Sequence, residues 1–102
     1  MQTSVDAEVV RALADPLRLR IVTLLVREAL CTTHLVAETG ARQTNLSNHL
    51  RVLREAGLVE SEPCGRFTYY KVRPEVLEVL AAFFGGLAQS AHTAGNARRP
   101  CP

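Results

Sequence analysis

The sequence contains no long apolar run and no large excess of charge of either sign, and both absences restrict what the protein can be. None of its apolar stretches approaches the roughly 20 residues that a membrane-spanning helix needs, and its first residues show no signal-peptide pattern. We therefore expect a soluble, cytoplasmic protein. The formal net charge is only +2, from 12 basic and 10 acidic side chains, so overall charge argues only weakly for nucleic-acid binding.

Signatures of catalysis are absent as well. The chain has no recognisable pairing of a nucleophile with a base and no glycine-rich loop of the kind that cradles phosphates, so we expect no enzyme. Its 102 residues suit one domain with a modest core. We assign that domain to residues 1–92 and expect residues 93–102, which are polar and rich in helix breakers, to form a flexible tail that carries Cys101.

Cysteine is scarce, and its count is odd. Cys31, Cys64 and Cys101 cannot all pair within one chain, and in a reducing cytosol they are expected to remain thiols. They are therefore candidate metal ligands or redox groups.

The stretch from Ala41 to Val59 carries the most informative pattern. Leu46, Leu50 and Leu53 recur at helical spacing and predict a helix with one buried face. The opposite face holds short amides, hydroxyls and a guanidinium, which can hydrogen-bond base edges and phosphates, and no acid occurs from position 42 to 54. An ordinary amphipathic surface helix is the alternative. The predicted DNA-contacting residues here are Arg42, Gln43, Thr44, Ser47, Asn48, His49 and Arg51.

Two helices are expected near the start of the chain. Thr3 or Ser4 can cap a first helix that ends at Ala14. Asp15 is a good N-cap and proline fits the first helical position, so a second helix is predicted from about Pro16 to Glu28. On that helix apolar residues point inward, namely Leu17, Ile21, Leu24 and Leu25, and arginines point mostly outward, namely Arg18, Arg20 and Arg27.

A helix-turn-helix motif is expected next. A short, extended connector over residues 29–31 leads to a third helix, which Thr32 or Thr33 caps and Gly40 ends. The polar-faced helix follows almost without a linker. Two helices joined so tightly, the second with a polar outer face, form a helix-turn-helix.

A β-hairpin is predicted after the motif. Residues 58–62 and 67–73 are extended runs separated by a four-residue turn with a basic tip. This arrangement is that of a winged helix, in which the tip of the wing lies against the phosphate backbone or the minor groove. Arg66 is the expected contact.

A last helix is predicted from Pro74 to about His92. Its apolar residues cover well over half of its circumference: Val76, Leu77, Val79, Leu80, Phe83, Phe84 and Leu87. So broad a surface exceeds the need of one small core and indicates a subunit interface. The predicted fold is mainly α with a β-hairpin wing, a homodimeric winged helix-turn-helix of about five helices. A winged-helix module that binds only protein is the alternative from another functional class.

Three segments resemble one family. RALADPLRLRIVTLL, NLSNHLRVLREAGLV and GRFTYYKV, in this order and spacing, are similar to the ArsR/SmtB family of bacterial repressors, over about residues 8 to 90. The resemblance implies a homodimer formed by the first and last helices. It also implies binding to an imperfect inverted repeat in operator DNA, and release when an inducer, often a soft metal or metalloid, binds.

The metal sites of that family are mostly not matched. Arsenic-type members of the family have a cluster of cysteines at this point. Here the segment Cys31-Thr32-Thr33-His34 retains at best the first thiol of that cluster. Of the ligands of the cadmium/lead type, only the thiol in the tail has an analogue in this sequence, namely Cys101. Other residues stand at the remaining ligand positions: Pro74 and Val76 for the zinc type, and Val52 and Ala56 for the cadmium/lead type.

The three thiols themselves suggest an inducer. Three sulfurs without histidine suit As(III), with Cd(II) and Pb(II) as alternatives, so Cys31, Cys64 and Cys101 are the predicted metal ligands. Their sulfurs would have to converge within about 4 Å. Cys31 and Cys64 are not obviously adjacent in one subunit, whereas the tail beyond His92 can extend about 30 Å, to its own subunit or its partner. A reversible disulfide under oxidant is the competing mechanism, and Cys31 also suits a core position.

Overall fold

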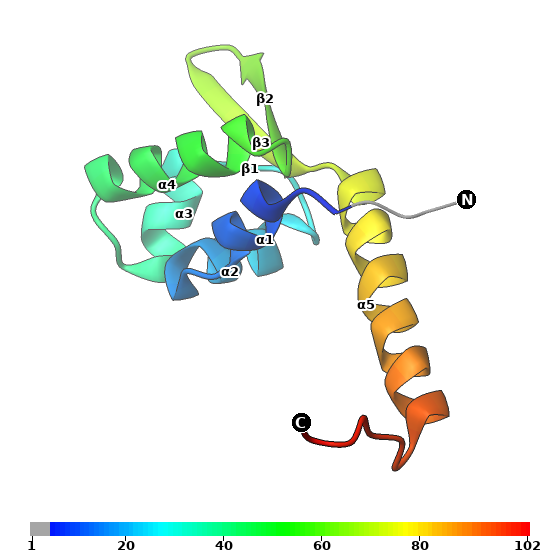
Figure 1. The fold of residues 1–102 in the computed structure, drawn as a ribbon. Helices are drawn as coiled ribbons and strands as arrows, with labels where there is room; N and C mark the ends of the chain where they lie inside the picture. The colour runs from blue at the N-terminus through cyan, green and yellow to red at the C-terminus, as the bar shows by residue number, and fades with distance from the viewer. Residues whose placement is uncertain (1–4) are drawn as a thin grey trace.

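The computed structural model describes residues 5–102, which form five helices and three strands (Figure 1). The elements are α1 (Ala7–Leu13), α2 (Pro16–Leu25), β1 (Leu30–Cys31), α3 (Thr32–Thr39), α4 (Gln43–Glu55), β2 (Val59–Cys64), β3 (Phe67–Val72) and α5 (Pro74–Ala94). This arrangement confirms the predicted winged helix-turn-helix. Among the described residues, no helix combines the length and apolar character needed to cross a membrane.

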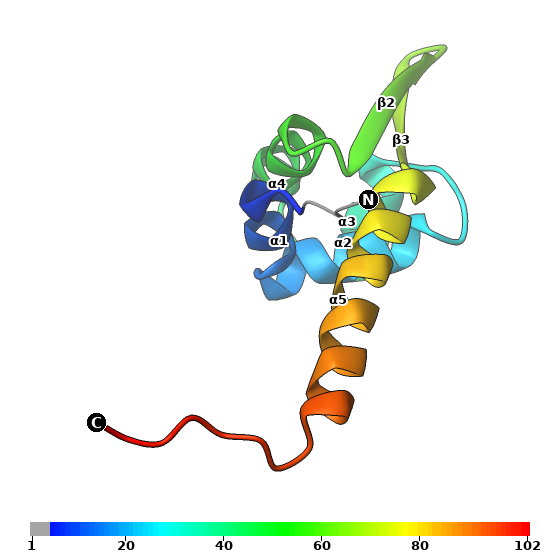
Figure 2. The ribbon, with the colours of Figure 1, turned by 45° about the vertical axis from the view of Figure 1, so that its right-hand side comes forward.

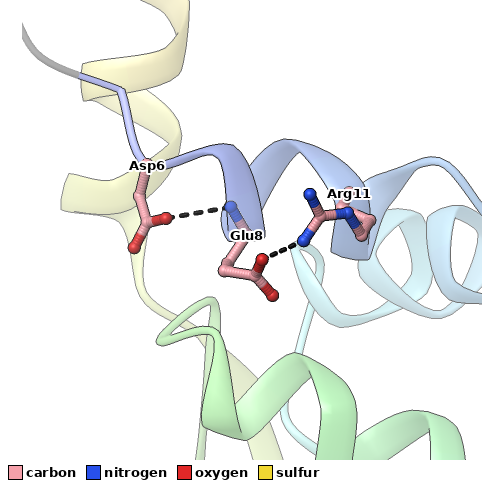
Figure 3. Close-up of polar contacts among 3 residues, drawn as sticks. All are labelled: Asp6, Glu8 and Arg11. Carbon is pink, nitrogen blue, oxygen red and sulfur yellow. Dashed lines mark hydrogen bonds and ion pairs between the residues drawn. The ribbon is translucent and has the colours of Figure 1, made fainter.

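Helix α1 begins later than the sequence predicted. The proposed caps Thr3 and Ser4 lie outside the described residues, and Asp6 caps the helix instead, accepting a hydrogen bond of 2.9 Å from the Glu8 N–H. A carboxylate at this end also complements the helix dipole. One turn on, Glu8 pairs with Arg11 (Figure 3). Both side chains are exposed, so this pair contributes little to stability.

Helix α2 begins as predicted but ends three residues early. The Asp15 carboxylate accepts hydrogen bonds from the N–H groups of Leu17 (2.8 Å) and Arg18 (3.0 Å), and Pro16 opens the helix. The helix ends at Leu25 rather than near Glu28, because the chain must turn into β1, which pairs with β3. The predicted outward orientation of Arg18 is wrong, since this side chain is half-buried.

The core forms where helices α1 to α4 meet the base of the wing. Leu46, Leu50 and Leu53 are all at most 1% exposed, as is Leu58 just beyond α4. The predicted buried stripe is therefore confirmed. Because burying a leucine side chain contributes roughly 1.5 to 3 kcal/mol, these residues anchor α4 and leave its other face to solvent. The remaining core residues include Ile21, Val22, Leu25 and Leu35.

The wing is part of a three-stranded antiparallel sheet with the order β1-β3-β2. The predicted extended connector forms β1, in which Cys31 lies opposite Tyr69. Strand β2 runs two residues further than predicted, so the turn contains only Gly65 and Arg66. Gly65 has a φ of +61°, which a tight hairpin turn requires and glycine adopts without strain. Pro63 is tolerated in β2 because this strand lies at the edge of the sheet.

Helix α5 leaves the rest of the molecule as a long projecting arm (Figures 1 and 2). Leu80 is its last buried residue and Phe83 is half-buried, whereas every residue from Phe84 to the end of the chain is exposed. The helix continues to Ala94, two residues past its predicted end at His92. It gives the chain an elongated shape, with extents of 61 × 27 × 20 Å.

Candidate nucleic-acid interface

The turn between α3 and α4 is closed by local hydrogen bonds. Gly40 ends α3 with a φ of +73°, and its N–H donates to the Val36 carbonyl at 2.8 Å. The Thr39 hydroxyl donates to the Leu35 carbonyl and accepts from the Ala41 N–H at 3.2 Å. These contacts set the angle at which α4 leaves α3.

Helix α4 presents the predicted polar residues to solvent. Arg42, Gln43, Thr44, Ser47, Asn48 and Arg51 are all exposed. The first turn holds no acidic residue, and the Arg42 side chain at the N-cap makes no capping hydrogen bond. The first backbone N–H groups of α4 therefore have no partner within the helix. An exposed helix start of this kind can bind a phosphate.

His49 is placed differently from the other predicted residues of α4. It is half-buried on the flank of the helix, and its Nδ1 lies 3.0 Å from Nη1 of Arg18. The Arg18 Nε also donates to the Ala12 carbonyl at 2.6 Å. Arg18 was absent from the predicted site, and no local pattern could have indicated it, because it is 31 positions from His49.

The tip of the wing combines a cation with an aromatic ring. Arg66 is exposed in the turn, and the neighbouring Phe67 is 53% exposed. Further down the wing, Lys71 pairs with Glu60 at 3.2 Å. That pairing offsets positive charge on the strands, so Arg66 is the basic group of the wing best placed to meet a phosphate.

The three thiols are free and lie apart. Cys31 is only 4% exposed and precedes α3, where its backbone N–H donates to Nδ1 of His34 at 3.1 Å. Cys64 is exposed at the end of β2, opposite Phe67, and Cys101 is exposed in the tail. Strands β1 and β2 flank β3 on opposite sides. With neighbouring strands about 4.8 Å apart, Cys31 and Cys64 are separated by roughly 10 Å or more.

A three-sulfur site therefore does not form within one subunit of this conformation. In the part of the chain that the structure describes, no group of three His, Cys, Asp or Glu side chains is arranged to hold a metal ion. The predicted ligand set would require thiols from a second subunit or a different path of the tail.

A short third helix, a tight turn, a helix with an exposed polar face and a basic wing define a winged helix-turn-helix protein. Residues 15–61 match the model of the bacterial regulatory proteins of the arsR family. The chain belongs to this family. Its members are regulatory proteins, which agrees with the prediction that the protein is no enzyme.

Relatives extend the likeness beyond the matched segment. The arsenic resistance transcriptional regulator ArsR1 of Pseudomonas putida is 35% identical over 80% of this chain and 65% of its own length. A solved structure described as a possible transcriptional regulator for arsenical resistance is 34% identical, with a TM-score of 0.72 over 93% of this chain and all of that one.

A third relative bears on assembly. It is the homodimeric winged helix-turn-helix DNA-binding domain of a possible ArsR-family regulator from Mycobacterium bovis, 27% identical with a TM-score of 0.69 over 92% of this chain and 86% of that one. The chain spans between half and two thirds of the length of the first curated relatives.

Proposed function

We propose that the protein is a dimeric transcriptional repressor that binds an imperfect inverted repeat in operator DNA, in the cytoplasm, and is released by a thiophilic ion, As(III) first among them. The exposed, acid-free face of α4 carries the DNA-binding part of this proposal. Three buried leucines hold that face outward, and the uncapped start of the helix offers N–H donors to a phosphate.

The residues of the interface divide by chemistry. Gln43 and Asn48 carry amides, which suit bidentate contacts to adenine in the major groove. Arg42 and Arg51 supply charge for phosphates, and Thr44 and Ser47 supply hydroxyls for either kind of contact. Arg66 at the tip of the wing adds a phosphate or minor-groove contact outside the footprint of α4.

The shape of the single chain supports a dimer. Its Cα radius of gyration is 17.4 Å, whereas a compact domain of 100 residues has about 13 Å. Large apolar side chains remain exposed on α1 and α5, namely Val10, Val79, Phe84 and Leu87. An apolar groove of about 270 Å³ lies between the same two helices. A second copy that covers α1 and α5 would bury this surface and place two copies of α4 on successive turns of one DNA face.

Thiol chemistry and the relatives support the choice of inducer. Three free thiols are soft ligands, and two relatives carry names that refer to arsenic resistance. Because Cys31 and Cys64 of one subunit lie too far apart to share an ion, a thiolate site must draw on the tail thiol Cys101 or on the partner subunit.

An oxidant response is the second candidate. Cys64 and Cys101 are both exposed, and exposed thiols are open to oxidation and disulfide formation. On this alternative the DNA-binding scaffold is the same and no ion is needed.

One titration tests the proposal. A duplex selected from a random library is bound by the reduced protein, and release is followed by fluorescence anisotropy as As(III), Cd(II), Pb(II), Zn(II) or hydrogen peroxide is added. We expect release by As(III) at protein-equivalent concentrations and none by Zn(II). Release by peroxide alone, with a mass loss of two hydrogens per disulfide, would favour the redox alternative. Absence of salt-dependent duplex binding would refute DNA binding itself.

A further inference from the structure

One guanidinium joins three helices beside the DNA-binding face. The Arg18 side chain, from the first turn of α2, donates through Nε to the Ala12 carbonyl of α1 at 2.6 Å. Its Nη1 lies 3.0 Å from Nδ1 of His49, in the middle of α4. The Arg18 backbone N–H is held in turn by the Asp15 carboxylate at 3.0 Å. The α1–α2 corner and α4 are therefore tied together through a single residue.

The contact determines the proton position on His49. An arginine side chain has donors and no acceptor, so Nδ1 of His49 must accept the hydrogen bond. Nδ1 then carries no proton, and the ring proton lies on Nε2. This assignment follows from the identity of the partner, because every nitrogen of the guanidinium is a donor.

The same side chain completes the end of α1. Ala12 lies in the last turn of that seven-residue helix, where carbonyl groups have no partner within the helix. Arg18 supplies one. Since His49 directly follows Asn48, a contact to the imidazole also restrains the part of α4 that carries Asn48.

We propose that Arg18 is a positioning residue for DNA recognition. It holds the His49 imidazole in its Nε2-protonated form, and through this contact it sets the orientation in which α4 presents Asn48 and Arg51. The inference rests on the proposed DNA-binding function. In this proposal His49, on the flank of α4, accepts the hydrogen bond that connects this helix to α2.

The planar fork of arginine is what the arrangement requires. Two nitrogens of one guanidinium reach acceptors on two different helices, whereas a lysine ammonium is a point charge on a flexible stem. The variant Arg18→Lys keeps the charge beside Glu8 and Glu55, which line the same surface hollow of about 340 Å³. It removes the two-helix bridge without changing the net charge.

The experiment uses the full chain and three substitutions. Arg18→Lys removes the bridge. Arg11→Lys is the matched control, because Arg11 is an exposed arginine near Arg18 whose side chain pairs with Glu8 of its own helix. In His49→Asn, an amide oxygen lies about as far along the side chain as Nδ1, so this conservative variant can still accept from Arg18.

The first readout is the tautomer of His49 in the DNA-free protein, from ¹⁵N NMR of the imidazole at pH 7.5. We expect an unprotonated Nδ1 and a protonated Nε2 in the wild type and in Arg11→Lys. In Arg18→Lys we expect a mixture of tautomers. A change that lowered the stability but left the protein folded with this contact intact would not alter the tautomer. A protonated Nδ1 in the wild type would overturn the proposal.

The second readout is the ratio of specific to non-specific duplex affinity. Loss of a hydrogen bond from a charged donor predicts a roughly tenfold lower ratio for Arg18→Lys. The salt slope should be unchanged because the charge is kept. Arg11→Lys should match the wild type, and His49→Asn should keep most of the ratio. A wild-type ratio in Arg18→Lys overturns this inference alone, whereas a wild type that binds no duplex overturns the proposed function and this inference with it.

Discussion

Cys31 and Cys64 lie on the two outer strands of the sheet, with β3 between them. Cys31 is opposite Tyr69 and Cys64 is opposite Phe67 on that central strand. Sheet geometry therefore prevents these two thiols of one subunit from binding the same ion without unpairing the wing. Any thiolate site must include Cys101 or a thiol of the second subunit.

Of the three predicted ligands, Cys101 is the one that the sheet does not hold in place, so its removal is the most direct test of the three-thiolate site. A chain that ends after Asn96 keeps every helix and strand, so its operator affinity should change only through the lost charges of Arg98 and Arg99. Its release by As(III) should be lost. Cys101→Ser in the full chain is the matched control, because it removes the sulfur and keeps both arginines. Normal release in both variants, measured by anisotropy, would show that Cys101 is no ligand.

The other two thiols should affect induction and spare repression. Cys31→Ser and Cys64→Ser each remove one sulfur, and neither residue lies on α4, so both variants should bind the operator with wild-type affinity. A thiolate site that has lost one sulfur should require a much higher As(III) concentration for release. If both variants respond as the wild type does, the three-thiolate hypothesis is wrong and the inducer binds elsewhere.

The projecting half of α5 should control the oligomeric state. Leu87 is 52% exposed in the single chain, so Leu87→Asp should leave the fold of the monomer intact. In a dimer the new carboxylate would be buried without a partner, which costs several kcal/mol. Leu87→Asp should therefore sediment as a monomer and lose operator binding. Gln89→Asp adds the same charge on the opposite side of the helix and should remain dimeric. A wild type that is monomeric at micromolar concentration would contradict the dimer.

Helix α4 and the wing should contribute differently to DNA binding. Asn48→Ala removes a base contact and should lower the ratio of specific to non-specific affinity by roughly 1 to 3 kcal/mol. Arg66→Ala removes a phosphate contact, so it should weaken binding to all duplexes and reduce the salt slope by about one. Salt titrations with the selected duplex and a scrambled one separate the two effects. Equal losses on both duplexes for both variants would refute this division.

Asp15 should make stability depend on acid pH. The hydrogen bond from the Arg18 N–H, supported by that from Leu17, lowers the pKa of the Asp15 carboxyl below its usual value. A group with a lowered folded-state pKa stabilises the fold fully above its unfolded pKa, which is about 3.9 for Asp. That contribution is lost as the pH falls below this value toward the folded pKa.

Urea unfolding at pH 6 and pH 3 measures this effect. Asp15→Asn keeps a side chain that can cap α2 and removes the charge. The variant should lose less stability than the wild type between the two pH values. The pKa of Glu75 is also lowered, by its own backbone N–H and by Arg73, so both proteins should keep some acid sensitivity. Equal losses in the two proteins would show that Asp15 does not contribute.

The features that the sequence predicted correctly depend on residues within a few positions of one another. Leu46, Leu50 and Leu53 repeat at helical spacing, so one face of α4 had to be buried. Asp15 before Pro16 specified the start of α2 in the same local way, and Gly40 specified the end of α3. Two boundaries were predicted wrongly, because a nearby residue or continued pairing took precedence. Asp6 caps α1, where Thr3 or Ser4 was expected. The turn of the wing is shorter than predicted, because β2 continues to pair with β3 as far as Cys64.

Contacts between distant segments were decided only by the tertiary structure. The residues next to Arg18 in the sequence do not indicate its contact with α4. Arg18 meets His49, 31 positions away, because α1, α2 and α4 pack around one apolar core. The thiols illustrate the opposite case, a contact that the sequence suggested and the fold does not form. Three cysteines suggested one site, but the order of the strands keeps Cys31 and Cys64 apart. Periodicity and capping depend on residues within about one helical turn, and a sequence displays them directly. The partner of a long polar side chain depends on how whole helices and strands pack, which only the folded chain determines.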